Sequence, residues 1–334
     1  MRRFETRSEA TMYRLLLALC LLLLSIALAQ AQSYPTKTVR IIVPHGPGGP
    51  GDVPPRGIAQ SLAQIFGQPF VVENREGADG LIGAEACAKG APDGHTLCST
   101  SSSVMIINPL VRSRLPYDPP RDFVPVSHYG AANSTLLINP SLKVNSVKEL
   151  VELARSKPES IAWGGLASSG TGSLVSSWFR NSLGAPFNQI PFKSTVPAMQ
   201  AAVSGSVQVV AYAAGPASGL VKAGKLKALA VLGRVRSRLL PDVPTLKELG
   251  YDFEYNTWFG MFAPAKTPSE IVHRLNAEIG KLLADREFNA KFVGSQGIEP
   301  DGLIAASPEE LVAFLKTDRD SIAKVLNAAG IERE

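Results

Sequence analysis

The sequence predicts an α/β fold in which mostly parallel sheets carry helices on both faces and are divided between two lobes. Short runs of β-branched and aromatic residues alternate with helical stretches along the chain, and turn residues mark the junctions. This alternation is typical of parallel sheets covered by helices. About 300 residues follow an N-terminal targeting segment, a length that is large for one hydrophobic core and suits two.

Residues 1–31 have the pattern of a secretory signal peptide. Several arginines precede an apolar run at residues 15–28, and Ala29-Gln30-Ala31 forms an A-x-A cleavage site. The run is shorter than the roughly twenty residues that span a bilayer, and no later segment is apolar for that long. We therefore expect cleavage after Ala31 and an exported, soluble mature protein. The sequence leaves open whether the chain starts at Met1 or at Met12.

Strands and helix ends can be predicted along the rest of the chain. Apolar runs predict strands at Val39–Val43, Phe70–Glu73, Thr96–Ser99, Thr135–Ile138, Ile161–Trp163, Val207–Tyr212 and Lys227–Leu232. The pattern S/T-x-x-E predicts capping boxes that begin at Ser146, Thr245, Thr267 and Ser307. Gly330 is expected to end the last helix.

The first predicted strand leads into a loop that is nearly free of side chains. Gly46 to Gly51 satisfies G-x-G-x-x-G, and Glu73 follows about twenty residues later, as in a dinucleotide-binding fingerprint. Pro50, Pro54 and Pro55 argue against that interpretation, because the fingerprint's helix should already be donating amides there. A helical pattern starts only near Ile58. The loop is therefore a plain turn, a cofactor loop or, as its exposed glycine N–H groups favour, an anion site.

Other loops after predicted strands are rich in hydroxyls and small residues. They lie at 100–103, 164–173, 193–195 and 213–216. Ligands of parallel sheets gather at the carboxyl ends of the strands, and hydroxyls in several loops together suit a carboxylate. Each loop taken alone is equally consistent with an ordinary helix N-cap.

Several functional classes lack support in the sequence. There is no G-x-S-x-G elbow and no P-loop, so an exported α/β enzyme, hydrolase or nucleotide-dependent oxidoreductase, has no specific motif behind it. The four histidines show no metal-like spacing, so neither a metal nor another cofactor is expected. The net charge of +5 is scattered, which argues against nucleic acid. Cys87 and Cys98 are either a disulfide of an exported protein or two small buried thiols.

Several short segments, in order, resemble the substrate-binding receptors of tripartite tricarboxylate transporters, also called Bug receptors. The resemblance rests on segments 44–52, 71–75, 91–97, 115–119, 147–150, 222–226, 240–245 and 258–264. Each segment is weak evidence alone, but their order and spacing cover essentially the whole mature chain.

The resemblance implies a two-lobed periplasmic binding protein of type II topology, with two Rossmann-like sandwiches joined by a two-strand hinge. Lobe one would comprise residues 34–130 and 254–334, and lobe two residues 131–253. A small organic anion would be held in the cleft and passed by a monomeric receptor to membrane permease subunits. A receptor that feeds a signalling system instead remains an alternative.

Candidate ligand-binding residues follow from the loops and from the resemblance together. They are Pro47, Gly48, Gly49, Asp52, Ser101, Ser102, Ser168, Ser169, Ser173, Lys193, Ser194, Thr195 and Ala214. Asp52 is expected to fix the loop's own amides or a water, and Lys193 is either a cleft charge or solvated surface.

This chain departs from the family pattern at positions that bear on the ligand. His45 stands where the family usually has Phe, Ser173 where it commonly has His, and Gln208 and Tyr212 replace acidic residues. Fewer carboxylates near a cleft lower the cost of bringing in an anion. We expect a compact mono- or dicarboxylate, or a close aromatic or amide analogue.

Overall fold

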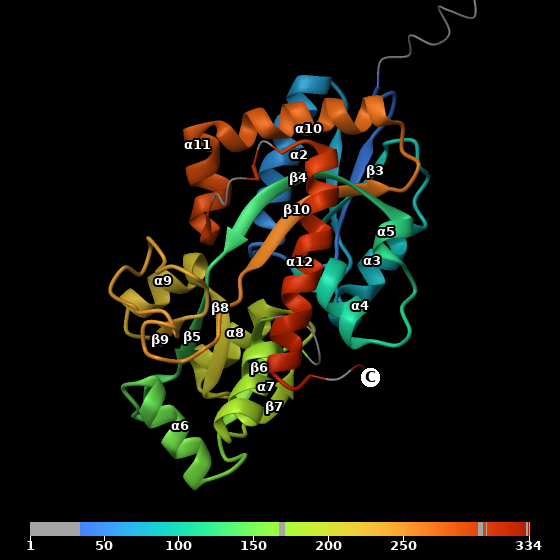
Figure 1. The fold of residues 1–334 in the computed structure, drawn as a ribbon. Helices are drawn as coiled ribbons and strands as arrows, with labels where there is room; N and C mark the ends of the chain where they lie inside the picture. Colours follow the sequence, from blue (N-terminus) through green and yellow to red (C-terminus); the bar gives the residue numbers. More distant parts are fainter. Residues whose placement is uncertain (1–33, 167–170, 300–302, 305, 332, 334) are drawn as a thin grey trace, which may run out of the picture. The chain divides into compact units, whose positions relative to one another are not determined.

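The computed structural model describes residues 34–166, 171–299, 303–304, 306–331 and 333 (Figure 1). The fold and the site described below belong to the compact unit Thr38–Glu334. The predicted signal peptide and the candidates Ser168 and Ser169 lie outside the described residues.

The first of two sheets has six strands in the order β11-β4-β10-β3-β1-β2. Its strands are β1 (Val39–Val43), β2 (Phe70–Asn74), β3 (Thr96–Ser101), β4 (Phe123–Ala132), β10 (Thr257–Pro264) and β11 (Ile298–Glu299). β1 pairs in parallel with β2 and β3, whereas β10 runs antiparallel to both β3 and β4. β10, which comes late in the chain, therefore lies between two strands from its first half, β3 and β4.

The second sheet has five strands in the order β7-β6-β8-β5-β9. Its strands are β5 (Ser134–Ile138), β6 (Ala162–Gly165), β7 (Asn188–Pro191), β8 (Val209–Ala213) and β9 (Lys227–Val231). β6 is parallel to β7 and β8, and β5 is antiparallel to β8 and β9. The prediction of mostly parallel sheets was wrong, because the strands next to the two chain crossings, β4, β5 and β10, run against their neighbours.

The chain crosses between the sheets at two places. β4 ends at Ala132 and β5 begins at Ser134, so that Asn133 alone separates them. The return passes from β9 to β10. An ideal Cβ on Gly233, just after β9, would lie 2.2 Å from Asn133 Oδ1 and 2.0 Å from Asn256 Oδ1. The two crossings and Gly233 are therefore packed against each other.

Helices cover both faces of each sheet (Figure 1). The first sheet is associated with α2 (Val53–Phe66), α3 (Leu81–Ala88), α4 (Asn108–Val111), α5 (Pro119–Asp122), α10 (Ser269–Ala284), α11 (Arg286–Phe288) and α12 (Pro308–Ala328). The second is associated with α6 (Val147–Ser156), α7 (Thr171–Leu183), α8 (Thr195–Ser204) and α9 (Ala214–Lys222). Single turns are η1 (Ala78–Gly80), η2 (Ser103–Ile107), η3 (Pro140–Leu142), η4 (Asn289–Val293) and η5 (Gly294–Gln296).

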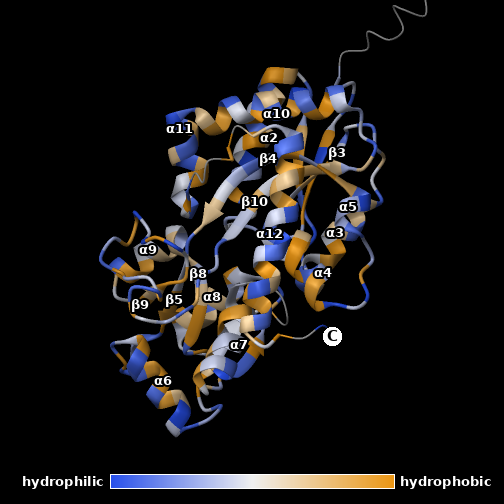
Figure 2. Ribbon diagram, in the orientation of Figure 1, coloured by the Kyte–Doolittle hydropathy of each residue, from blue (hydrophilic) through white to orange (hydrophobic). Residues whose placement is uncertain are grey.

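The pattern of buried side chains explains this layering. Along β8, Val209 and Ala211 pack in a cluster with Trp163, while Val210 and Tyr212 pack with Ala198 of α8 on the other face. A strand that is buried on both faces reads as a continuous apolar run. The outer helices instead mix hydrophobic and hydrophilic residues, as α6, α10 and α12 show in Figure 2, because only one side of each is covered.

Helix α12 connects the two halves of the molecule. It packs on β4 and reaches α7, where Asn181 donates to the Ala329 carbonyl oxygen over 2.6 Å (Figure 1). Its start is the predicted capping box, with Ser307 and Glu310 each accepting from the other's backbone N–H, and it ends before Gly330. None of the helices among the described residues combines the length and the apolar character needed to cross a membrane.

The other three predicted capping boxes are met only in part, although α6 does start after Ser146. Ser146 caps α6 through the Glu149 N–H, but Glu149 accepts from Asn145 instead of Ser146. Thr245 and Glu248 exchange both capping-box bonds in a turn that does not continue as a helix. The Thr267 hydroxyl instead donates to the Pro264 carbonyl oxygen, so no capping box forms there.

Cys87 of α3 and Cys98 of β3 form a disulfide, with their Cα atoms 6.1 Å apart. The sequence left a disulfide and two buried thiols open, and the structure has the disulfide. Both residues are buried in the hydrophobic cluster behind β1 and β3. The bond therefore ties α3 to the sheet from inside the core.

Candidate ligand-binding site

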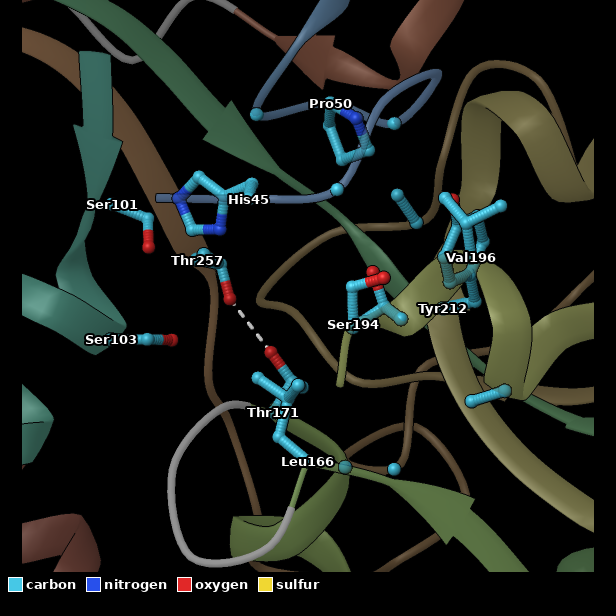
Figure 3. A pocket seen from close by; sticks show the side chains of 18 of the residues that line it. His45, Pro50, Ser101, Ser103, Leu166, Thr171, Ser194, Val196, Tyr212 and Thr257 are labelled. Carbon is cyan, nitrogen blue, oxygen red and sulfur yellow. Dashed lines mark hydrogen bonds between the residues drawn. The ribbon is translucent and has the colours of Figure 1, made fainter. Parts of the chain in front are cut away.

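A cavity of about 90 Å³ lies between the two sheets. This volume is well above the roughly 10–15 Å³ that one water needs. The first sheet's side contributes His45, Ser101 and Phe259, and the second sheet's side contributes Thr171, Ser194 and Tyr212 (Figure 3). The cavity is therefore an interlobe cleft whose walls come from both halves of the molecule.

The loop after β1 forms one wall with very few side-chain atoms. Gly46, Gly49 and Gly51 line the cavity. The N–H groups of Gly49 and Gly51 donate to no oxygen of the described chain. Buried N–H groups are normally paired, so two unpaired ones on residues that line a cavity are available to a ligand acceptor.

Asp52 holds this loop in place from behind. Its carboxylate, 2% exposed, accepts from the Gly48 N–H over 2.9 Å, from Arg56 Nε over 2.8 Å and from Asn74 Nδ2 over 2.7 Å. Burial alone would raise the pKa of Asp52, but the hydrogen bonds from Arg56, Gly48 and Asn74 outweigh it and lower the pKa. Asp52 is thus charged, fully occupied and directed at the loop.

Helix α2 begins at Val53, not near Ile58 as the sequence pattern indicated. Pro54 and Pro55 lie in its first turn, a place where proline is tolerated because those N–H groups would have no helical partner. The start of α2 therefore offers few amide donors. The glycine loop itself supplies the free N–H groups, an arrangement that does not suit the pyrophosphate cradle of a dinucleotide fold.

Several other helices begin at the cavity wall. Gly80 precedes α3, Thr171 starts α7, Thr195 starts α8 and Ala213 precedes α9, and all four line the cavity. The first N–H groups of a helix have no intrahelical partners, and the helix dipole puts partial positive charge at that end. Their convergence gives the cleft a positive potential without a cluster of cationic side chains.

The ionisable groups in the described part of the wall are few. Asp79 is paired with Arg112 at 2.5 Å, so its charge is compensated. Burial lowers the pKa of His45 to about 4, against the opposing charge of Asp52, so the imidazole is neutral at pH 7. Lys193 adds a positive charge at the exposed rim. The balance favours an anion.

The two walls touch in the described conformation. An ideal Cβ on Gly46 would lie 2.6 Å from Ser194 Oγ, and one on Gly49 would lie 3.4 Å from Tyr212 Oη. Thr171 of α7 and Thr257 of β10 share a buried hydrogen bond of 2.6 Å, drawn in Figure 3. The cleft is closed in this conformation, with contacts between glycine backbone and small hydroxyl residues.

The candidates predicted from the sequence divide into three groups. Those that line the cavity are Gly49, Ser101, Lys193, Ser194 and Thr195. Those that lie behind the wall or outside it are Pro47, Gly48, Asp52, Ser102, Ser173 and Ala214. Among these, the Ser102 hydroxyl bonds with Tyr255 Oη, and Ser173 donates to the Leu166 carbonyl oxygen. Ser168 and Ser169 belong to the third group, outside the described residues.

Sequence reasoning missed several residues of the wall. Thr171, Thr257 and Phe259 were not singled out, and His45 and Tyr212 were noted only as departures from a family pattern. Thr257 and Phe259 belong to β10, whose return to the first sheet is a long-range event. Thr171 could have been found, because it follows β6 at the end where ligands bind.

Comparison with known proteins identifies the family. The model of the tripartite tricarboxylate transporter family receptor matches residues 55–329. The chain belongs to this receptor family. Protein BugT of Bordetella pertussis is 34% identical over 302 residues, which cover 90% of this chain and 91% of the relative.

Solved structures of such receptors have the same two-lobed fold. An R. palustris protein solved with adipate is 32% identical, with a TM-score of 0.84 over 90% of this chain and 100% of that one. MatC of Rhodopseudomonas palustris, solved with bound malate, is 29% identical, with a TM-score of 0.80 over 88% of this chain and 100% of that one. The family and the fold are those of solute-binding receptors, not of enzymes.

Proposed function

We propose that the protein is a periplasmic receptor that captures a small carboxylate in the interlobe cleft and delivers it to the permease subunits of a tripartite tricarboxylate transporter. The observation that carries the proposal is the convergence of helix N-termini and free glycine N–H groups on a cavity whose acidic side chain is already paired. The adipate and malate named for two similar structures support a carboxylate ligand.

The proposed mechanism is a shift of population toward the closed form. Residues 34–130 with 254–334 would move as one lobe and residues 131–253 as the other, about the crossings near Asn133 and Asn256. A ligand that contacts both lobes binds the closed form better than the open form, and so favours closure. The closed receptor, acting as a monomer, then presents the ligand to the permease.

Titration calorimetry and thermal unfolding of the protein purified from the periplasm test the choice of ligand. The panel contains succinate, malate and adipate, with aspartate and a neutral sugar for comparison. We expect at least one carboxylate to raise the unfolding temperature, because a ligand that binds only the folded state stabilises it. Aspartate should bind more weakly than malate, since the described lining offers its ammonium no uncompensated carboxylate. Binding of the sugar alone would refute the proposal.

The delivery step needs a separate experiment in the producing bacterium. Deleting the permease genes should abolish uptake of the radiolabelled ligand while leaving the purified receptor's affinity unchanged. Uptake that persists at the original rate, with growth responses to the ligand lost instead, would point to a sensor.

A further inference from the structure

The hydroxyl group of Tyr212 is a buried polar group at the cavity that has no partner. Tyr212 lies on β8, is 3% exposed and lines the cavity. Its Oη atom makes no hydrogen bond within the described chain. Burial raises the pKa of Tyr212 to about 12, and the Thr195 hydroxyl, which is close enough to oppose the shift, does not reach Oη in hydrogen-bonding geometry. The phenol is therefore protonated at neutral pH and has a proton to donate.

The Tyr212 hydroxyl faces the glycine loop of the opposite lobe. An ideal Cβ on Gly49 would lie 3.4 Å from Tyr212 Oη and 3.5 Å from Val196 Cγ2. Gly49 and Gly51 carry the free N–H groups described above. Figure 3 shows Tyr212 and Val196 on the side of the cavity opposite His45 and Ser101. The phenol and the Gly49 backbone thus belong to different lobes and lie close together at the cavity, whereas Gly51 packs against His45.

We propose that Tyr212 is a specificity-determining residue that donates a hydrogen bond, across the closed cleft, to the ligand oxygen held by the glycine loop. The inference rests on the proposed function and names the lobe-two group that recognises the carboxylate. In the open form the hydroxyl would be separated from the loop and would meet water. The ligand oxygen therefore gains this bond only on closure, which couples recognition to the movement of the lobes.

Because the hydroxyl is buried without a partner, removing it should have a second effect, on stability, that can be measured without ligand. In the closed form the hydroxyl is buried and makes no hydrogen bond with the described chain, and in the open form it meets water, so in neither form does it add to the stability of the ligand-free protein. Replacing Tyr212 by Phe keeps the packing against Val196 and removes only the oxygen. The ligand-free protein should therefore be as stable as wild type or more stable, although the same substitution weakens ligand binding.

The experiment compares wild type, Tyr212→Phe and Tyr129→Phe by calorimetry with succinate, malate and adipate, and by thermal unfolding without ligand. Tyr129 is the matched control, since its buried hydroxyl donates to Ser99 Oγ over 3.3 Å and it does not line the cavity. We expect Tyr212→Phe to weaken carboxylate binding about tenfold or more, which corresponds to about 1.4 kcal/mol. Its unfolding temperature should not fall. Tyr129→Phe should show the reverse pattern, with normal affinity and a lower unfolding temperature.

The outcomes separate this inference from the proposed function. If wild type binds no carboxylate of the panel, the proposed function and this inference both fail. If wild type binds and Tyr212→Phe binds equally well, the inference alone is overturned. A Tyr212→Phe protein that loses both affinity and unfolding temperature also overturns it, because the hydroxyl would then stabilise the fold itself.

Discussion

At the scale of single residues, His45 links the cavity to pH. Its imidazole lies 5.9 Å from the Phe259 ring, edge to face, and its Nε2 atom is buried without a hydrogen-bond partner in the described chain. Burial keeps the ring neutral by lowering its pKa to about 4. A neutral ring presents no charge to the ligand at pH 7, and its protonation in the folded state is disfavoured.

The stability of the protein should therefore fall between pH 6.5 and pH 4. In this window the unfolded chain takes up a proton on His45 that the folded chain does not, so the free energy of unfolding decreases as the pH is lowered. The loss approaches about 3 kcal/mol at most and stops below pH 4. Urea unfolding of His45→Phe, which keeps an aromatic ring, should show this part of the pH dependence removed. The exposed His273→Gln variant should retain it, and an unchanged slope in His45→Phe would refute the assignment.

At the scale of elements, Asp52 joins three pieces of structure. Its carboxylate binds the glycine loop through Gly48, helix α2 through Arg56 and strand β2 through Asn74. Asn74 also donates to the His45 carbonyl oxygen over 2.9 Å, and Arg56 Nη2 donates to Asn74 Oδ1 over 2.6 Å. The loop's shape is thus set by the elements around it and not by the ligand.

Replacing Asp52 by Asn should lower both stability and ligand affinity. The substitution keeps the size but replaces one accepting oxygen by an NH2 donor, so the bonds to that atom are lost and those to the other oxygen become neutral, with an expected loss of about 1–3 kcal/mol in the free energy of unfolding. Because the pKa of Asp52 is lowered on folding, its contribution is present above about pH 4 and is lost as the pH falls through the folded-state pKa. Urea titrations at pH 7 and pH 3 and calorimetry check both effects. The exposed Asp242→Asn variant serves as the control, and unchanged stability and binding in Asp52→Asn would contradict this role.

At the scale of elements, a comparison of the predicted with the observed strands also shows where sequence reasoning succeeds. Strands such as β1 and β8 are almost wholly apolar and buried on both faces, so their composition reveals them. β4 and β10 contain Pro125, Gly130 and Gly260 within their bounds, and β-bulges interrupt their pairing. Local propensity does not identify such strands, and only the resemblance to a known family pointed to the strand at Trp258. Antiparallel pairing beside the crossings has no local signal either.

At the scale of the whole molecule, closure of the cleft depends on how closely the glycine loop of the first lobe can approach the residues of the second lobe. Gly46 meets Ser194 with no room for a side chain, since an ideal Cβ would lie 3.0 Å from Ser194 Cβ as well as 2.6 Å from its oxygen. Such contacts come from residues far apart in the sequence. Loop composition therefore indicated which loops line the cleft, whereas the pairs that meet across it required the structure.

Gly46→Ala should impair closure without unfolding the protein. We expect ligand affinity to fall about tenfold or more and the ligand-induced decrease in radius of gyration, measured by small-angle X-ray scattering, to become smaller. Adding Ser194→Gly should restore part of both, because it removes one of the two side chains in the way, whereas Glu76 Oε2, also 2.6 Å from that Cβ, remains. Gly219→Ala, on α9 with open space around its ideal Cβ, is the control that should behave as wild type. Full compaction and wild-type affinity in Gly46→Ala would show that the walls do not meet on closure.

The bareness of the glycine wall has a consequence for how such receptors acquire new ligands. An ideal Cβ on Gly51 would lie 2.5 Å from His45 Cδ2, so side chains are excluded at this position as at Gly46. Changes of ligand preference are therefore expected at lining residues outside the glycine loop, such as Leu166, Val196 and Tyr212. A library built for a biosensor should leave residues 46–52 untouched and diversify the middle of the gene. The glycine loop would then keep the groups that bind the carboxylate unchanged. The varied residues would determine which carboxylate the receptor prefers.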